Sequence, residues 1–286
     1  MFCCSPNGTS IPDTLTAKPT LSLVPPGECQ FTTEWDSVAL LKKFVVSETS
    51  CVLRFACPDK TKPLNLSTCA CILAKADIPD ADGEMQAVIR PYTPISTNAQ
   101  IGSFDMLIKD YKENGTMSRF LCEDLNVGDS IDFKHIEFNV KTQAPFQWKK
   151  IAMLVGGTGI TPMVQALHAI LGDKSSEIQV DMLYGSRVSS DILGKEMLDS
   201  WSKEERLNVT HVLSHEPEGS SWKGARGFIT KELIEEKFPS PDEEDIVIFV
   251  CGPAVMYDIF SGPRGESEVS GILAEMGYSS EQVYKF

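Results

Sequence analysis

The chain has 286 residues, which is long enough for one large domain or two ordinary domains, each with its own core. A hydrophobic content of 42% and a charged content of 23% are ordinary for a globular protein, and no apolar run approaches the roughly 18–20 residues that span a bilayer. The net charge of −14 argues against nucleic acid or an anionic membrane as the main partner.

The spacing of the cysteines and the sequence of the first 20 residues indicate the cellular compartment of the protein. Nine cysteines are scattered without a CxxC pair or a His/Cys ligand spacing, so we expect free thiols in a reducing compartment and no metal site. Cys69 and Cys71 alternate within an apolar run and are predicted to be buried strand residues. Because the first 20 residues follow neither a signal-peptide nor a transit-peptide pattern, a cytoplasmic protein without a transmembrane anchor is expected.

Residues 1–30 are predicted to be a flexible tail, and residues 31–147 a β-domain. The latter contain short apolar segments separated by clusters of Gly, Pro, Asp and Asn, which is typical of an antiparallel barrel or sandwich. These segments read SVALLKKFVV, CVLRFAC, TCACILAKA, MQAVI, SFDMLIKDY and DSIDFKHIEFNVK.

One of these segments, MQAVI, is followed directly by RPYTPIS (residues 90–96). Pro91 and Pro94 each remove a backbone donor from a strand ladder, so the strand is predicted to end at Ile89. The interruption leaves Arg90, Tyr92 and Thr93 on irregular backbone, where their side chains can bind a ligand.

The second half, residues 148–286, alternates strand and helix patterns after a linker, TQAPFQW (residues 142–148). Each strand pattern precedes a helical one: IAMLVGG before PMVQALHAIL, IQVDMLYG before SSDILGKEMLDSWSKEE, NVTHVLSH before TKELIEEKF, and DIVIFVCG before two helical stretches. That alternation predicts a parallel, doubly wound α/β sheet.

Two turns in this half lie where an α/β sheet binds ligands, at the carboxyl ends of strands. VGGTGITPM (residues 155–163) joins a strand to a helix, where backbone N–H groups favour phosphate, and its glycines allow close approach by a ligand. It lacks the Gly-Lys-Ser/Thr ending of a Walker A loop. CGPAVM (residues 251–256) ends a later strand, so both turns are expected to face one crevice. The alternative for Cys251 is an ordinary buried thiol.

A further glycine turn lies in the first half, in NGTMSRFLCEDL (residues 114–125). Gly115 and Thr116 precede a short predicted helix, with Ser118 at or near its N-cap. The segment is either a capped connector or a second phosphate site built from open N–H groups and a hydroxyl.

Together, RPYTPIS, GTMSRFL, GGTGITPM, SSDIL and CGP resemble the ferredoxin–NADP reductase superfamily, in particular its NADH–cytochrome b5 reductase branch, over residues 36–286. The resemblance implies an antiparallel FAD-binding β-barrel followed by a doubly wound NAD(P)H-binding domain. It also implies an enzyme in which NADH delivers a hydride to flavin N5 and single electrons pass to a haem protein such as cytochrome b5. The chain departs from the family in having Ala254 after CGP and no Gly-Pro-x-Gly turn after DSIDFK.

By resemblance, the RPYT segment holds FAD. Arg90 pairs with the pyrophosphate, Tyr92 packs along the flavin and Thr93 hydrogen-bonds near N5. An arginine fork suits a diphosphate and a flat aromatic side chain suits a flat ring. The remaining residues assigned to FAD are Pro91, Leu107, Ile108, Lys109, Tyr111, Gly115, Thr116, Met117, Ser118, Thr161 and Phe286.

By the same resemblance, the NADH crevice contains Gly157, Thr158, Cys251, Gly252, Pro253 and Met256. Thr93 and Cys251 are the residues expected nearest the hydride transfer, and the four histidines are not expected to be catalytic. Asp191, in SSDIL, is assigned to the adenosine ribose and predicts a preference for NADH. A carboxylate accepts hydrogen bonds from ribose hydroxyls and repels a 2′-phosphate. The alternative for Asp191 is a helix N-terminal residue favoured by the dipole.

The partners expected are therefore NADH and a one-electron acceptor protein, with the chain a monomer. Residues 151–286 carry 11 Lys/Arg and 22 Asp/Glu, so an acidic acceptor is expected to approach the flavin half through Lys42, Lys43, Lys149 and Lys150. Two alternatives stay open. One is an NADPH-dependent reductase of the superfamily that serves ferredoxin, flavodoxin or a nitrate-reducing partner, and the other is a non-enzymatic nucleotide-binding or redox-sensing module.

Overall fold

The computed structural model describes residues 11–112, 115–136 and 144–286, and within these ranges the chain divides into two compact units. Of the described residues, the first unit takes in 11–17, 29–65, 71–112 and 115–136, and the second takes in 18–28, 66–70 and 144–286. Two short segments from the N-terminal part of the sequence therefore pack with the C-terminal half. The domain boundaries predicted after residues 30 and 147 stay predictions.

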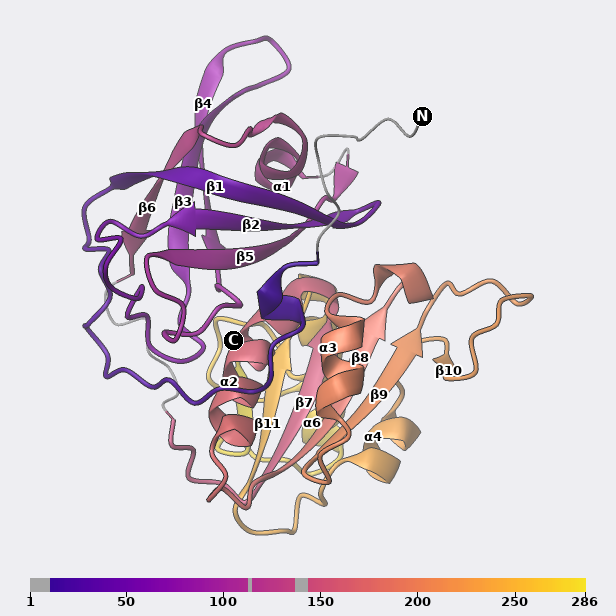
Figure 1. The fold of residues 1–286 in the computed structure, drawn as a ribbon. Coiled ribbons are helices and arrows are strands. Elements are labelled where there is room, and N and C mark those ends of the chain that lie inside the picture. Colours follow the sequence, from indigo (N-terminus) through magenta and orange to yellow (C-terminus); the bar gives the residue numbers. More distant parts are fainter. Residues whose placement is uncertain (1–10, 113–114, 137–143) are drawn as a thin grey trace, which may run out of the picture. The chain divides into compact units, whose positions relative to one another are not determined.

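The first unit is built on an antiparallel sheet in the order β4-β3-β6-β1-β2-β5, as predicted (Figure 1). A short helix, α1 (Thr116–Arg119), continues into one π-helical turn, η3 (Phe120–Asp124), and a 3-10 turn, η1 (Asp13–Leu15), precedes the sheet. The strands are β1 (Asp36–Ser47), β2 (Ser50–Ala56), β3 (Ile72–Pro79), β4 (Met85–Tyr92), β5 (Ser103–Lys109) and β6 (Ser130–His135). The end of the last predicted segment, residues 137–141, lies outside the described residues.

The core of this unit is aromatic. Phe55, Phe104 and Phe133 are fully buried and lie with ring centroids 5.0–5.8 Å apart. Beside them, the Arg54 guanidinium donates two hydrogen bonds, of 2.7 and 2.8 Å, to the fully buried carboxylate of Asp105. A buried charge is tolerated when it is paired and hydrogen-bonded in this way.

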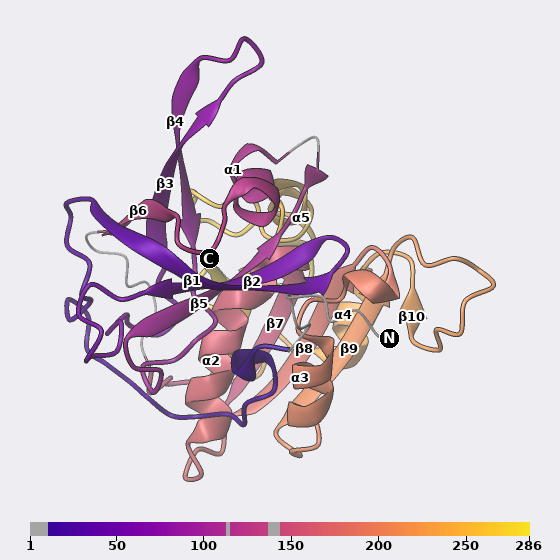
Figure 2. The ribbon, with the colours of Figure 1, turned by 45° about the horizontal axis from the view of Figure 1, so that its top comes forward.

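The strand predicted to end at Ile89 runs on to Tyr92, so that prediction is wrong. In β4, Arg90, Pro91 and Tyr92 lie opposite Ala74, Leu73 and Ile72 of β3. Strand β4, which pairs only with β3, is the edge of the sheet (Figure 2). Because an edge strand has a neighbour on one side only, a proline there removes no bond that a second neighbour would accept.

The second unit contains the predicted parallel sheet, in the order β10-β9-β8-β7-β11-β12. Both end strands, β10 and β12, are too short for a periodic pattern and were not predicted. The strands are β7 (Lys150–Gly156), β8 (Gln179–Ser186), β9 (Leu207–Leu213), β10 (Ala225–Arg226), β11 (Ile246–Cys251) and β12 (Val283–Lys285).

Helices cover both faces of this sheet. The apolar side chains of α4, α5 and α6 pack with strand residues in one buried cluster, and α2 and α3 lie together on the other face (Figure 1), where His168 contacts Trp201. The predicted helix over residues 189–205 is divided, since Gly194 adopts a left-handed φ of 68°. The helices and turns are η4 (Gly157–Gly159), α2 (Ile160–Gly172), η5 (Ser189–Asp191), α3 (Lys195–Trp201), α4 (Lys231–Lys237), α5 (Ala254–Phe260) and α6 (Gly271–Glu275).

Cys69 and Cys71 are not strand residues, because β3 begins only at Ile72. Cys69 has a positive φ of 62°, and its thiol donates a 3.3 Å hydrogen bond to the Pro162 carbonyl. The segment Leu66–Ala70 thus belongs to the second unit, where Cys69 contacts the first turn of α2. Burial raises the pKa of the Cys69 thiol, so this cysteine stays protonated.

The described part of the predicted tail, residues 11–30, makes defined contacts. The Thr14 hydroxyl donates a 2.8 Å hydrogen bond to Asp105 in the first unit, and the Thr20 N–H donates a 3.0 Å hydrogen bond to His168 Nδ1 in the second. Burial lowers the pKa of His168 to about 4. His168 is therefore neutral near pH 7 and holds the Thr20 backbone in place.

Candidate functional site

The candidate nucleotide site lies at the carboxyl ends of β7 and β11, where the strand order of the parallel sheet reverses. From β7 the chain runs outward through β8, β9 and β10, and then returns to the opposite side of β7 as β11. Such a topological switch point is where open α/β sheets bind ligands. The turns GGTG and CGP follow these two neighbouring strands.

The two turns, which were predicted to face one crevice, are in direct contact. A Cβ atom added to Gly156 would lie 2.9 Å from Pro253 Cδ and 2.8 Å from Met256 Sδ, and one added to Gly252 would lie 3.3 Å from Gly156 N. A Cβ added to Gly159 would fall deep inside van der Waals contact with the Cys251 carbonyl group. At Gly159 the obstacle is backbone, whereas at Gly156 and Gly252 the nearest atoms are those of the Met256 and Pro253 side chains.

Gly157 differs from its neighbours. It has a left-handed φ of 51° and open space where a side chain would be. Its carbonyl is fixed by a 3.0 Å hydrogen bond from the buried Tyr184 hydroxyl. The turn is therefore rigid on its protein side and open on the other, which fits the close approach of a dinucleotide.

Helix α2 begins at Ile160, two residues before Pro162, which was expected to be its first residue. Proline is still tolerated, since the first four N–H groups of a helix have no acceptor within it. Thr161 is buried, and its hydroxyl donates a 3.2 Å hydrogen bond to the Thr158 carbonyl. Both threonines thus belong to one rigid turn, and the contact of Thr161 with flavin stays a prediction.

Cys251 ends β11 and is partly exposed, whereas its neighbours in the strand are buried. The C-terminus packs beside it: the Phe286 N–H donates to the Val250 carbonyl at 3.0 Å, and the Tyr257 hydroxyl donates to the Phe286 carbonyl at 2.6 Å. The Phe286 ring is buried against Phe249, at 5.3 Å between centroids. The structure therefore brings Cys251, Gly252, Pro253, Met256 and Phe286 together.

Asp191 lies at the end of η5, four residues before α3 begins, and is partly exposed. It therefore lies in η5 rather than in α3, and its contact with the ribose stays a prediction. The turn follows β8, the strand next to β7, at the same edge of the sheet as the glycine turns. In dinucleotide folds an acidic residue near the end of the second strand meets the ribose.

In the first unit, Arg90, Pro91, Tyr92 and Thr93 lie at the end of the edge strand β4. Arg90 is exposed, and its Nη1 donates to the Ile89 carbonyl at 2.7 Å. Tyr92 is half-buried, and burial raises the pKa of its phenol. Near it, the Sγ atoms of Cys51 and Cys122 are 2.8 Å apart.

The turn before α1 requires glycine. A Cβ on Gly115 would lie 2.9 Å from Tyr111 Cβ and would also collide with the Ser118 hydroxyl. The N-cap of α1 is Gly115 rather than Ser118, which is buried inside the helix beside the buried Met117. Ser118 was predicted at or near the N-cap because hydroxyl residues favour that position, but the tight contact with Tyr111 admits only glycine there.

The predicted flavin-lining residues of β5 and the segment after it differ in their exposure to solvent. Leu107 and Ile108 are buried in β5, Lys109 ends the strand half-buried, and Tyr111 lies beyond it, 48% exposed. Alternation places Leu107 and Lys109 on one face of β5. Tyr111 follows the strand and packs on the Gly115 turn, which links the two predicted FAD segments.

Both halves of the chain match known protein families. Residues 37–138 match the family described as "Oxidoreductase FAD-binding domain", and residues 153–261 match the "Oxidoreductase NAD-binding domain". The chain is 37% identical over 257 residues to NADH-cytochrome b5 reductase 2 of Scheffersomyces stipitis, covering 88% of this chain and 84% of that protein. The protein of the same name from Emericella nidulans is 38% identical over 258 residues, covering 88% and 78%.

A solved structure supports the fold. The cytochrome b5 reductase domain of Ulva prolifera nitrate reductase superposes with a TM-score of 0.75 at 26% identity, covering 93% of this chain and 99% of that one. The antiparallel FAD-binding sheet and the parallel NAD-binding sheet predicted from the sequence are thereby confirmed.

Proposed function

We propose that this chain, which belongs to the NADH–cytochrome b5 reductase family, takes a hydride from NADH. It then passes single electrons to a haem protein such as cytochrome b5. It is an oxidoreductase with FAD-binding and NAD-binding domains. Bound FAD supplies the redox chemistry, by accepting the hydride at N5 and releasing its electrons one at a time. The protein contributes positioning and electrostatics.

The observation that carries this proposal is the contact between the GGTG and CGP turns at the switch point of the parallel sheet. The open side of Gly157 would receive the coenzyme pyrophosphate, and Cys251 would lie beside the nicotinamide. On the flavin half, Arg90 and residues 115–118 would hold the pyrophosphate, while Tyr92 and Thr93 would orient the ring. Thr93 and Cys251 are the groups proposed to lie nearest the reacting atoms.

The test begins with colour. The purified protein is expected to be yellow, to bleach when NADH is added without oxygen, and to recover its colour when oxidised cytochrome b5 follows. A colourless protein that FAD does not reconstitute would support the non-enzymatic module. Rapid reduction of ferredoxin or flavodoxin, but not cytochrome b5, would support the other reductase class. The relatives found favour neither alternative.

Replacing Arg90 by alanine is expected to weaken FAD binding. Arg90 is exposed, and its Nη1 donates to the neighbouring Ile89 carbonyl rather than to a carboxylate, so we expect the guanidinium to reach a diphosphate. Hydrogen bonds to charged groups contribute about 1.5–3 kcal/mol, and about 1.4 kcal/mol is one decade of affinity. We therefore expect roughly a tenfold to hundredfold higher Kd, measured by flavin release on dilution. Full flavin occupancy in the variant would exclude this role.

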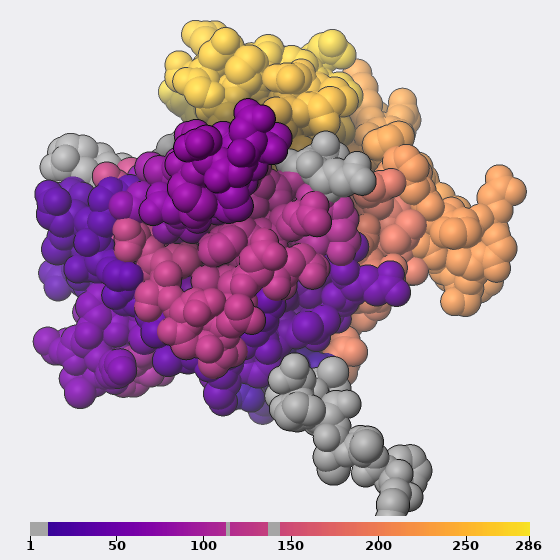
Figure 3. Space-filling model, turned by 90° about the horizontal axis from the view of Figure 1, so that it is seen from above, coloured from indigo at the N-terminus to yellow at the C-terminus, as the bar shows by residue number. Residues whose placement is uncertain are grey.

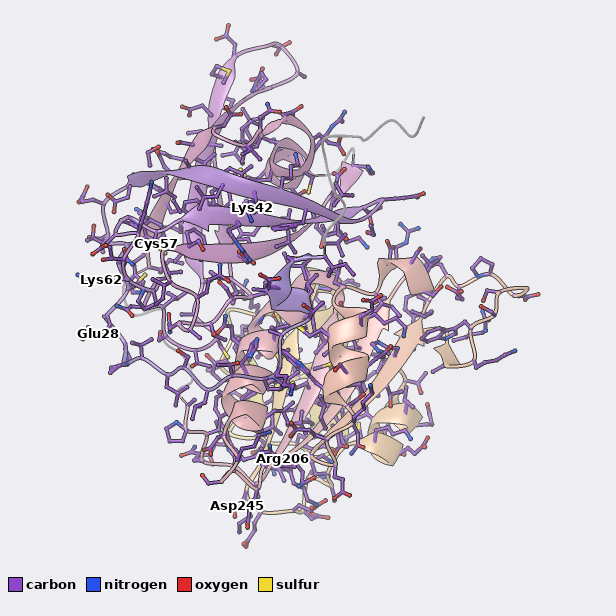
Figure 4. All side chains as sticks on the ribbon, in the orientation of Figure 1. Glu28, Lys42, Cys57, Lys62, Arg206 and Asp245 are labelled. Carbon is purple, nitrogen blue, oxygen red and sulfur yellow. The ribbon has the colours of Figure 1, made fainter. Side chains whose placement is uncertain are left out.

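The basic patch predicted for an acidic acceptor needs correction. Lys149 pairs with Asp245 at 2.7 Å and Lys150 pairs with Glu243, so neither offers free positive charge. Figure 4 shows Asp245 at the amino-terminal edge of the parallel sheet, opposite the glycine turns. Lys43 donates to the Leu125 carbonyl at 3.1 Å, whereas Lys42 is exposed on β1. Of the four lysines, we retain Lys42 and Lys43.

Turnover limited by encounter with cytochrome b5 is expected to fall as salt is added, because ions screen charges over a Debye length of about 8–10 Å. Lys42→Ala should lower kcat/KM for cytochrome b5 several-fold at low salt and flatten the salt dependence. Lys149→Ala is the matched control, since its ammonium is already paired with Asp245. A rate that rises with salt would mean that the net negative charge dominates the encounter.

Compartment and assembly remain proposals. No helix within the described residues is long and apolar enough to cross a membrane. The seven cysteines in the described ranges are free thiols, which supports a reducing compartment, and we propose the cytoplasm. We also propose a monomer, testable by light scattering.

A further inference from the structure

Glu216, in the loop between β9 and β10, reaches across to the turn that follows β8. Its Oε2 accepts a 2.6 Å hydrogen bond from the Ser189 N–H, and its Oε1 accepts a 3.0 Å hydrogen bond from the Ser189 hydroxyl. The two segments follow neighbouring parallel strands, with Ser186 opposite Leu213. The loop, drawn in orange, projects beyond the end of β9 in Figure 1, and the orange segments form a lobe on the surface in Figure 3.

The pair of donors on Ser189 is the kind that binds phosphate. A backbone N–H and a neighbouring hydroxyl on one residue converge on a single anion, as at many phosphate sites. Here that anion is the protein's own carboxylate. The hydrogen bond from the Ser189 N–H holds the pKa of Glu216 below its usual range, with a smaller contribution from the nearby Arg226. Glu216 is therefore charged near pH 7.

Arg226 fixes the loop that carries this carboxylate. Its Nη1 donates 3.0 Å hydrogen bonds to the carbonyls of Glu216 and Pro217, and its Nη2 donates to the Ser220 hydroxyl and the Trp222 carbonyl. Arg226 thus holds the backbone of Glu216, and its positive charge stays near the carboxylate. The arrangement is a complete anion site, with two donors on Ser189 and a cation close by.

The position of this anion site bears on the coenzyme. Ser189 is two residues from Asp191, in the same turn η5, at the strand end where dinucleotide folds meet the adenosine ribose. NADPH differs from NADH only by a phosphate on the ribose 2′-oxygen. A phosphate entering here would find the Ser189 donors occupied and would meet a second negative charge.

We propose that Glu216 is a second determinant of coenzyme choice, acting as an internal anion on the donor pair that a 2′-phosphate would need. This inference rests on the proposed function, because it concerns the same NADH site. It is distinct from the role of Asp191: Asp191 is assigned to the ribose hydroxyls, whereas Glu216 fills the place beside them. Glu216 does not weaken the binding of NADH, because the NADH ribose carries no phosphate that would need an anion site.

The experiment replaces Glu216 by glutamine and, separately, by alanine. Glu218→Gln is the matched control, because this substitution removes the same charge from an exposed residue of the same loop. The ratio of kcat/KM for NADPH to that for NADH is expected to rise about tenfold to a hundredfold in both Glu216 variants. The rise should come from NADPH, with kcat/KM for NADH within about twofold of wild type.

A binding measurement separates this inference from the proposed reaction. Adenosine 2′,5′-bisphosphate, titrated calorimetrically, should bind the Glu216 variants about tenfold or more tightly than the wild type or Glu218→Gln. An unchanged coenzyme ratio and unchanged bisphosphate affinity would overturn the inference. Equal weakening of NADH and NADPH would also overturn it, because it would show that Glu216 only supports the fold of the loop. Failure of the wild type to oxidise NADH would count against the proposed function, while the bisphosphate titration would still decide the role of Glu216.

Discussion

Gly159→Ala is expected to lower kcat/KM for NADH by up to about a hundredfold without loss of FAD. The added methyl group would enter the Cys251 carbonyl and would lie 2.9 Å from Gly252 N. These are backbone atoms at the carboxyl end of β11, which cannot rotate away as a side chain can. Overpacking of this kind costs about 1–3 kcal/mol, and about 1.4 kcal/mol is a factor of ten. The change would push apart the two turns that form the crevice.

The measurement is steady-state NADH oxidation with ferricyanide as acceptor, together with the flavin-to-protein absorbance ratio. Gly265→Ala is the control, since a Cβ there meets nothing within 4 Å in the same unit. Retained flavin with impaired NADH kinetics would place the damage in the nucleotide half. Kinetics like those of the wild type would show that the turns can separate without cost, and the crevice would then lie elsewhere.

Asp191→Thr is expected to move the coenzyme preference toward NADPH by about a hundredfold, because like charges brought together cost up to several kcal/mol. Asp191 is partly exposed at the end of η5, the turn that follows β8. Threonine keeps a hydroxyl that can hydrogen-bond the ribose and removes the charge that repels a 2′-phosphate.

The ratio of kcat/KM for the two coenzymes, in wild type and variant, decides this prediction. Asp242→Thr is the matched control, because it makes the same replacement at an exposed residue near the amino-terminal edge of the sheet, away from the glycine turns. Equal use of both coenzymes by the wild type would show that Asp191 does not select. A variant that keeps the wild-type ratio would assign the selection to other residues of the site.

The sequence was sufficient wherever the signal was local. The alternation of apolar strands with helical patterns after Lys150 predicted the parallel sheet, and the GGTG and CGP segments predicted the two turns at its carboxyl edge. Their contact also followed, since turns after adjacent parallel strands meet at one edge. Short interrupted strands before residue 136 predicted the antiparallel sheet. In each case, hydrophobic period and glycine chemistry act over a few residues.

Tertiary structure decided whatever depended on neighbours distant in sequence. Pro91 was expected to end a strand, but β4 continues because it lies at an edge, and only the strand order shows which strand that is. The positive charge of Lys149 was expected to be free, but Asp245, almost one hundred residues later, neutralises it. No pattern around Glu216 or Ser189 relates the two, because β8 and β9 bring them together only in the folded sheet. Local sequence specifies which element forms, whereas pairing, edges and charge partners depend on long-range packing of the whole unit.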